Sequence, residues 1–316
     1  MSGIAGPIDR HDDNVTSITN AGNYVQRRID LIIEIGQGQN GAEGSKKYTV
    51  RGLRVAAQIE KLSAQVGGSG ACQVTVWGLP FPLMQDLSSM ARPIPIVRRN
   101  KLTVMAGDQW HMAEVFSGDV WEAWADYNAM PEVGMTISCT PGAAAQMKPV
   151  DPISVDGQMD AVILLQQLAA AMGKDFENSG VPQTMLDHPY FPGTAWDQMT
   201  AISTAAHINA TIDGNTLAIW PVNGARQQDQ IPLISATTGM VGYPSYAGYG
   251  IRVRTIFNNQ IRFGSKFRID SEIKAANGEW IITMLSHDLA AEMPDGPWFT
   301  DLEGFRLGQS AGLPSQ

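Results

Sequence analysis

Residues 102–139 decide the fold, and they read LTVMAGDQWHMAEVFSGDVWEAWADYNAMPEVGMTISC. Apolar side chains recur at every second position in three runs of this stretch, and such alternation marks half-buried strands. Short turns separate the runs, one of them centred on a proline, so we predict consecutive antiparallel strands. The three runs are Leu102, Val104 and Ala106, then Trp121, Ala123, Ala125 and Tyr127, and finally Val133, Met135, Ile137 and Cys139.

The same alternation extends toward the N-terminus. Runs of alternating apolar residues begin at Ile29, Leu53 and Cys72, with one short helix expected over residues 83–90. We therefore predict a mostly antiparallel β domain over residues 26–145, of a size that suits a barrel or a sandwich. Residues 1–25 are polar, and we expect them to form an N-terminal arm ordered by partners.

Helical periodicity replaces strand periodicity after the Pro-Gly-Ala stretch at residues 141–145. Asp156 is expected to cap a helix over residues 158–172, because a carboxylate can accept hydrogen bonds from the first free N–H groups of a helix. Thr194 is expected to cap a second helix, with Asp197 favouring the positive end of its dipole.

A hairpin over residues 210–219 closes this small α+β domain, whose predicted bounds are 150–225. Strand patterns then return, with alternation over 251–257 and a hairpin signal at Asn277-Gly278. We therefore predict a second β domain over residues 231–316, similar to the first in length and turn spacing. The expected fold class is mainly β, with two antiparallel β domains flanking a small helical and hairpin domain.

The charge pattern argues against a nucleic-acid-binding protein. The formal net charge is −9, and residues 131–230 hold 3 basic against 10 acidic side chains. Stable binding to nucleic acid needs clustered Lys and Arg that displace counterions from phosphates. We expect no such binding, although an acidic pore could let DNA pass without retaining it.

Membrane insertion and cysteine chemistry are also not expected. The longest apolar candidate, residues 161–172, is too short to span a bilayer, and residues 1–10 do not have the features of a signal peptide. Cys72 and Cys139 lie far apart without CxxC spacing, so we interpret them as buried free thiols.

Four motif-like patterns have simpler interpretations than catalysis or cofactor binding. Residues 36–41 spell GxGxxG, but another strand follows where a dinucleotide site needs a helix, so a hairpin loop is expected. Ser286-His287-Asp288 holds triad residue types, but neighbours on a strand point to opposite faces. The five histidines show no metal-ligand spacing, and we expect no metal or cofactor. Carboxylate pairs are too numerous in this acidic chain to select a glycosidase couple.

The aromatic residues of the opening stretch are candidate contact residues. Trp121 and Trp124 should lie on opposite faces of one strand, so one is expected in the core and the other at a protein interface. A sugar-binding platform or a plain surface role remains an alternative interpretation. The complete set of interface candidates is Trp110, Trp121, Trp124, Tyr127 and Trp298.

Two stretches resemble bacteriophage tail baseplate hub proteins. The first is residues 102–139, with its strands ending in Ala-Gly and Phe-Ser-Gly and its Pro131 turn, preceded by Trp77-Gly78-Leu79-Pro80. The second is residues 261–304, with IRFG at 261–264, ANGEW at 276–280 and PDGPW at 294–298 in similar order. Each motif is a turn with flanking strands, so their order carries more weight than any one of them.

The resemblance implies two tail-tube-like β-barrels, at residues 26–145 and 231–316, and a homotrimer that forms a pseudo-six-fold ring. It leaves open whether residues 231–249 complete the first barrel. The implied function is a structural hub, not an enzyme, that connects a hexameric tail tube or tube adaptor to a trimeric spike beside other baseplate proteins. Its implied location is the virion tail, after assembly in the host cytoplasm.

Two rival functions stay open on the sequence alone. One is a tail-associated hydrolase or carbohydrate-binding receptor module, which a carboxylate pair in a deep cleft beside Trp110 or Trp124 would favour. The other is the related hub of a bacterial secretion or contractile-injection particle, which is expected to share the fold.

Overall fold

The computed structural model describes residues 26–36, 44–62, 70–88, 100–147, 149–247 and 250–306. The predicted N-terminal arm, residues 1–25, lies outside the described residues. We call residues 26–140 the first β part, 150–225 the insert and 231–306 the second β part.

In its described residues the first β part holds seven strands, which the alternating pattern predicts, and one short helix. Its hairpin from β1 to β2 confirms that the chain returns as a strand after the GxGxxG sequence, whose loop residues 37–43 lie outside the described part. The elements are β1 (Arg28–Gly36), β2 (Ser45–Val50), β3 (Val55–Lys61), β4 (Ala71–Trp77), α1 (Phe81–Leu87), β5 (Lys101–Gly107), β6 (Met112–Ala125) and β7 (Gly134–Thr140). A 3-10 turn (Tyr127–Ala129) and a cis Met130–Pro131 bond lie between β6 and β7.

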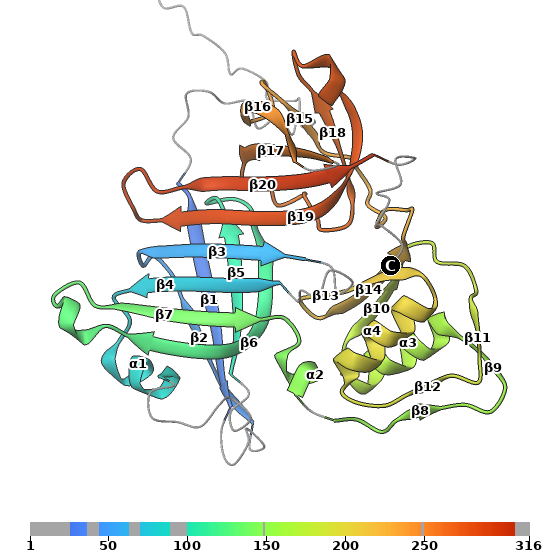
Figure 1. Ribbon diagram of the computed structural model, residues 1–316. Coiled ribbons are helices and arrows are strands. Elements are labelled where there is room, and N and C mark those ends of the chain that lie inside the picture. Colours follow the sequence, from blue (N-terminus) through green and yellow to red (C-terminus); the bar gives the residue numbers. More distant parts are fainter. Residues whose placement is uncertain are drawn as a thin grey trace, which may run out of the picture.

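The insert packs two helices on one face of a three-stranded sheet, in the order β10-β14-β13 (Figure 1). Side chains alternate along β14: Leu217 and Ile219 join the core under the helices, whereas Ala218 and Trp220 join the core of the second β part. The elements are α2 (Ala143–Met147), β8 (Ile153–Ser154), β9 (Gln158–Asp160), α3 (Ala161–Ala171), β10 (Asp175–Asn178), β11 (Met185–Asp187), β12 (Tyr190–Phe191), α4 (Ala195–Ala205), β13 (Ile208–Asp213) and β14 (Thr216–Pro221).

The cap of α3 differs from the prediction. Residues 158–160 form strand β9, which pairs with β11, and the carboxylate of Asp160 accepts a hydrogen bond from the N–H of Val162 at 3.0 Å. The same Asp160 oxygen also accepts from the N–H of Thr184 at 3.1 Å. The helix therefore begins after Asp160, not after Asp156, because a strand pairing formed far along the chain holds the intervening residues. The predicted cap of α4 is confirmed as a capping box between Thr194 and Asp197.

The second β part is built around one long strand. β19 spans 14 residues; its first residues pair with β18, and Leu285–Ala291 pair with β3 of the first β part. A 3-10 turn (Lys274–Ala276) leads into β19. The strands are β15 (Leu233–Ser235), β16 (Met240–Ala247), β17 (Gly250–Ile256), β18 (Lys266–Asp270), β19 (Gly278–Ala291) and β20 (Trp298–Phe305).

The pairing of β19 with β3 joins both β parts into one continuous sheet. The path of this 13-stranded sheet runs β16-β17-β20-β19-β3-β4-β7-β6-β5-β1-β2; off this path, β18 pairs with β19 and β15 pairs with β18. Figure 1 shows β20, β19, β3, β4 and β7 lying side by side, with β1 and β5 crossing behind them. The two separate closed barrels that we expected are not found among the described residues, because β19 occupies the outer edge of β3.

The described strands of residues 231–249 pair within the second β part. β15 pairs with β18 and β16 pairs with β17, so the described strands of this segment extend the second β part and do not complete the first.

The two β parts nevertheless share one strand order. Antiparallel pairing gives β3-β4-β7-β6-β5 in the first and β16-β17-β20-β19-β18 in the second. Each part has its own buried core, and Leu289, Ala291 and Trp298 of the second part pack into the core of the first. The mainly β fold class is therefore confirmed, and the molecule contains a repeat at the level of topology.

Candidate functional site

Strand β6 carries two exposed tryptophans on its outer face. Trp121 is 45% exposed and Trp124 is 44% exposed. Val120 pairs with Cys139 and Glu122 pairs with Ser138, so Trp121 is the extra residue of a β-bulge. The bulge shifts the alternation by one position. Our expectation that one of these tryptophans lies in the core is therefore wrong.

Trp110 and Tyr127 lie apart from that pair. Trp110 is 63% exposed in the turn before β6, where the carboxylate of Asp108 accepts a hydrogen bond from its N–H at 2.7 Å. Tyr127 follows the other end of β6, is half-buried and packs edge-on against Phe81, with ring centroids 5.8 Å apart. The structure thus groups Trp121 and Trp124, and it places Trp110 at the opposite end of the strand.

Trp298 is not a surface residue. It is only 7% exposed and packs edge-on against Phe257, with ring centroids 5.3 Å apart. The guanidinium of Arg27 lies 5.8 Å from its ring centroid. Trp298 therefore contributes to the core where the two β parts meet and is withdrawn as an interface candidate.

Strand β16, which ends the strand path of the large sheet, carries two exposed tyrosines that were not among the predicted contact residues. Tyr243 is 65% exposed and Tyr246 is 67% exposed. Tyrosine is enriched at protein interfaces because its ring gives contact area and its hydroxyl stays hydrated. The spacing of three tyrosines at 243, 246 and 249 is the sequence feature that could have indicated this surface.

The outer face of the continuous sheet is mostly polar. One register row runs Glu122, Ser138, Gln73, Gln58 and Asp288 across β6, β7, β4, β3 and β19. Directly opposed residues lie on the same face of a sheet, so these side chains form one stripe.

The stripe on β20 and β17 is charged. Arg254 donates to Asp301 through Nε and a terminal nitrogen, both at 2.8 Å, and Arg252 pairs with Glu303. The hydrogen bonds that Arg254 donates to Asp301 raise the pKa of Arg254, while partial burial raises the pKa of Asp288. Both arginines are paired, whereas Glu60, Glu122 and Asp288 add negative charge, so this outer face is acidic.

A buried charged junction joins the three parts of the chain. The Arg226 side chain is fully buried; it donates to both carboxylate oxygens of Glu177 at 2.7 and 2.8 Å and to Asp213 at 2.8 Å. Lys61, the last residue of β3, donates to the second oxygen of Asp213 at 2.8 Å. Arg262 lies 3.6 Å from Glu177.

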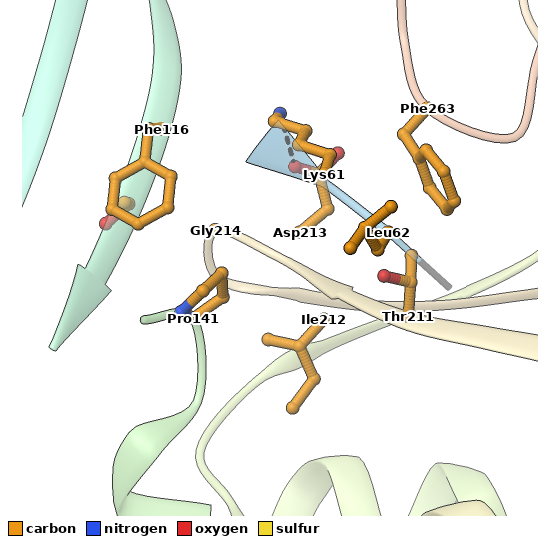
Figure 2. Close-up of a pocket in the computed structure, with 10 residues that line it drawn as sticks. Lys61, Leu62, Phe116, Pro141, Thr211, Ile212, Asp213, Gly214 and Phe263 are labelled. Carbon is orange, nitrogen blue, oxygen red and sulfur yellow. Dashed lines mark hydrogen bonds and ion pairs between the residues drawn. The ribbon is translucent and has the colours of Figure 1, made fainter. Parts of the chain in front are cut away.

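Figure 2 shows the Lys61–Asp213 pair between Phe116 of the first β part and Phe263 of the second. The cavity beside them measures about 10 Å³, which is room for no more than about one water. Burial alone would raise the pKa of Asp213, but Lys61 and Arg226 outweigh it and lower the pKa. This arrangement can hold the three parts together and cannot admit a substrate.

Catalytic chemistry finds no support at the positions that the sequence suggested. Ser286, His287 and Asp288 are consecutive on β19, and the His287 ring nitrogen Nδ1 lies 2.9 Å from the hydroxyl of Thr300. Burial, helped by nearby Lys61, lowers the pKa of His287 to about 3, so its imidazole is neutral. A groove of about 830 Å³ beside Arg262 and Lys266 has Asp229 as its one lining carboxylate, whereas glycosidases need a pair.

Among the described residues, no group of three or more His, Cys, Asp or Glu side chains could hold a metal ion. Cys72 and Cys139 are buried free thiols, and burial raises the pKa of both. Within the described ranges no helix has the length and apolar content of a membrane span.

The fold is that of phage tail proteins. Over 88% of this chain and 96% of the other, it superposes on a tail protein from Neisseria meningitidis MC58 with a TM-score of 0.61 and 10% identity. The 43 kDa tail protein of prophage MuSo2 from Shewanella oneidensis gives a TM-score of 0.54 at 10% identity, over 88% of this chain and 96% of that one.

A component of the Escherichia coli type VI secretion system, c3393, also superposes. Its TM-score is 0.52 at 8% identity, over 93% of this chain and 77% of that one, and it is described as structurally similar to the T4 tail proteins gp27 and gp5. No curated protein matched the sequence.

The sequence also matches the model of a protein family. The family model described as baseplate hub gp41 matches residues 28–304. The chain belongs to this family of structural baseplate hub proteins of phage tails. The resemblance drawn from residues 102–139 and 261–304 is thereby confirmed.

Proposed function

We propose that the chain is a structural hub subunit that forms a homotrimeric ring between the hexameric tail tube, or a tube adaptor, and the trimeric spike. One observation carries this proposal: the two β parts share a strand order and stand side by side in one sheet, joined at β3 and β19. Three chains with two such parts each supply six similar units. A ring of six units matches a six-fold tube on one side, and its true three-fold symmetry matches a spike on the other.

The acidic outer face of the continuous sheet supports a channel in this ring. Carboxylates and small polar side chains follow one another from β6 to β17, and the arginines there are paired with Asp301 and Glu303. Like charges repel, so DNA passing along such a face would not be retained. The proposed role therefore includes no stable binding of nucleic acid and no enzymatic step. Other baseplate proteins are proposed as further partners in the virion, which is assembled in the host cytoplasm.

Removing the chain from an infecting phage tests this function. Particles that lack it should contain filled heads without attached tails, because the tube would have no ring on which to begin. A chain restored from a plasmid is the control and should return tails to normal. Normal tails in its absence, or a monomer in tails extracted under non-denaturing conditions, would overturn the proposal.

A further inference from the structure

The two β parts match in register as well as in strand order. Each has a bulge at the same point of its long strand: Trp121 is the extra residue of β6 and Thr283 that of β19. Ala125 lies four residues after the bulge of β6, and His287 lies four residues after the bulge of β19, so the two residues occupy equivalent positions. The partners of these strands then place Tyr246 of β16 at the position of Ile59 of β3.

Within one chain, these matched positions form the joint between the β parts. His287 of β19 lies directly opposite Ile59 of β3, and Ser286 lies opposite Glu60. Ile59 is 0% exposed and lies in the buried core of the first β part, to which Leu289 and Ala291 of β19 contribute. The joint is therefore an antiparallel pair between the long strand of one part and the edge strand of the other.

From this repeat we infer that one subunit binds the next through the end of β6 against β16 of a second copy, antiparallel, with Ala125 opposite Tyr246 and Trp124 opposite Ala247. This inference rests on the proposed function for ring closure, because the joint inside the chain is repeated between chains.

The exposure of Tyr246 supports the inference independently of ring symmetry. Tyr246 lies opposite Ile251, which is 1% exposed, so both side chains point to the core face of the sheet. Tyr246 is nevertheless 67% exposed, whereas Ile59 at the matched position is buried. A large aromatic side chain on a core face with no cover in the single chain is typical of an interface position.

The end of β6 offers the complementary edge. β5 pairs with β6 only as far as Asp119. At Trp124 and Ala125, β7 is the one strand neighbour among the described residues. Helix α1 also contacts β6, but no described strand other than β7 pairs with it at Trp124 and Ala125. A strand edge without a second strand partner is a template for pairing with another chain. Because the two edges of each copy differ, the contact is head-to-tail, and such contacts close into a ring when the rotation allows it.

A disulfide between Trp124→Cys and Ala247→Cys tests the pairing in the full-length chain. Both side chains point to the outer face, and directly opposed residues in antiparallel strands have Cα atoms about 4.5 to 5.5 Å apart, within disulfide range. Cys72 and Cys139 are buried and will react slowly. Under oxidising glutathione at high protein concentration, we expect a covalent trimer as the largest species on a gel without reductant.

The matched control is Trp110→Cys with Ala247→Cys, which places an equally exposed cysteine outside the contact and should remain monomeric on the gel. A double variant that stays uncross-linked, whether the chain is a trimer or a monomer by light scattering, overturns the pairing. If light scattering gives a trimer in that case, the proposed function stands. A ladder that continues beyond the trimer would support the pairing and overturn the closed ring.

Discussion

The side chain of His287 is buried where β19 meets β3 and β20, and its neutral form is built into the core. A histidine in an unfolded chain has a pKa near 6.5, whereas burial holds that of His287 at about 3. Between these values the unfolded chain binds a proton that the folded chain does not. Its contribution to stability is therefore present at neutral pH and is lost as the pH falls through this window.

This linkage predicts a pH-dependent free energy of unfolding. Between pH 7 and pH 5, the His287 contribution should fall by about 2 kcal/mol. His287→Gln should be less stable at pH 7 but should lack this part of the decline, because glutamine does not titrate. Urea unfolding at the two pH values measures the difference. His188→Gln, at an exposed site, is the control and should keep the decline of the native chain.

Two tryptophans of the candidate site show why a local sequence pattern does not predict the face or the burial of every side chain. The alternation of residues 121–127 could not show the bulge at Trp121, because a bulge is defined by the partner strand β7. The burial of Trp298 depends on Phe257 and Arg27, which are distant in sequence. Long-range pairing therefore changed the face or the depth of two predicted contact residues, and the contact role of the others stays a prediction.

At the scale of elements, the cap of α4 is the clearest link from sequence to local structure. The hydroxyl of Thr194 accepts from the N–H of Asp197 at 3.1 Å, and the Asp197 carboxylate accepts from the N–H of Thr194 at 3.0 Å. The hydrogen bonds from Thr194 also lower the pKa of Asp197. Both halves of a capping box are thus satisfied.

Removal of this cap has a predictable cost. Thr194→Ala should lower the free energy of unfolding by about 1 kcal/mol, because free N–H groups of the first turn lose their partner. Thr204→Ala, near the other end of α4, is the matched control and should have a smaller effect, since its hydroxyl only doubles the hydrogen bonding of a backbone carbonyl. Equal losses in chemical denaturation would contradict the capping argument.

Most of the long helices and strands could be predicted from local sequence patterns, and the strands that were missed share one cause. Strands with regular alternation, such as β1 and β5, were predicted because a half-buried strand must place every second side chain inward. β9 and β16 were missed because pairing with distant β11 and β17 makes them strands. Their own residues have little periodicity.

At the scale of the whole molecule, the charged junction connects the first β part, the insert and the second β part. Arg226 contacts Glu177 and Asp213 of the insert, and Asp213 in turn contacts Lys61 of the first β part. Arg226 itself lies on the segment that leads to the second β part. Because Arg226 is buried, its loss would leave the carboxylates of Glu177 and Asp213 without this partner in a poorly solvated site.

Arg226→Met should therefore lower the free energy of unfolding by about 3–5 kcal/mol, since Glu177 and Asp213 would each lose a buried partner. Arg252→Met removes an exposed ion pair with Glu303 and should cost no more than about 1 kcal/mol. Equilibrium urea unfolding of both variants compares the two values. Similar small losses would show that the junction does not hold the parts together.

The way in which the β parts meet could not be predicted from the sequence. Turn signals and periodicity locate domains along the chain, whereas the contact between β3 and β19 joins residues from opposite ends of it. The candidate junction was missed for the same reason, since Lys61, Glu177, Asp213 and Arg226 are individually ordinary charged residues. Only the fold brings them within hydrogen-bonding distance.

The β3–β19 pair has a consequence for synthesis on the ribosome. Strand β3 ends at Lys61, and its partner does not begin until Gly278, so residues 62–277 are translated before that neighbour emerges. During this interval the β3 edge of the nascent first β part lacks its β19 partner and can pair wrongly with other nascent chains. Slow translation of the codons between β3 and β19 would lengthen the interval, whereas a chaperone that shields strand edges would protect the edge during it.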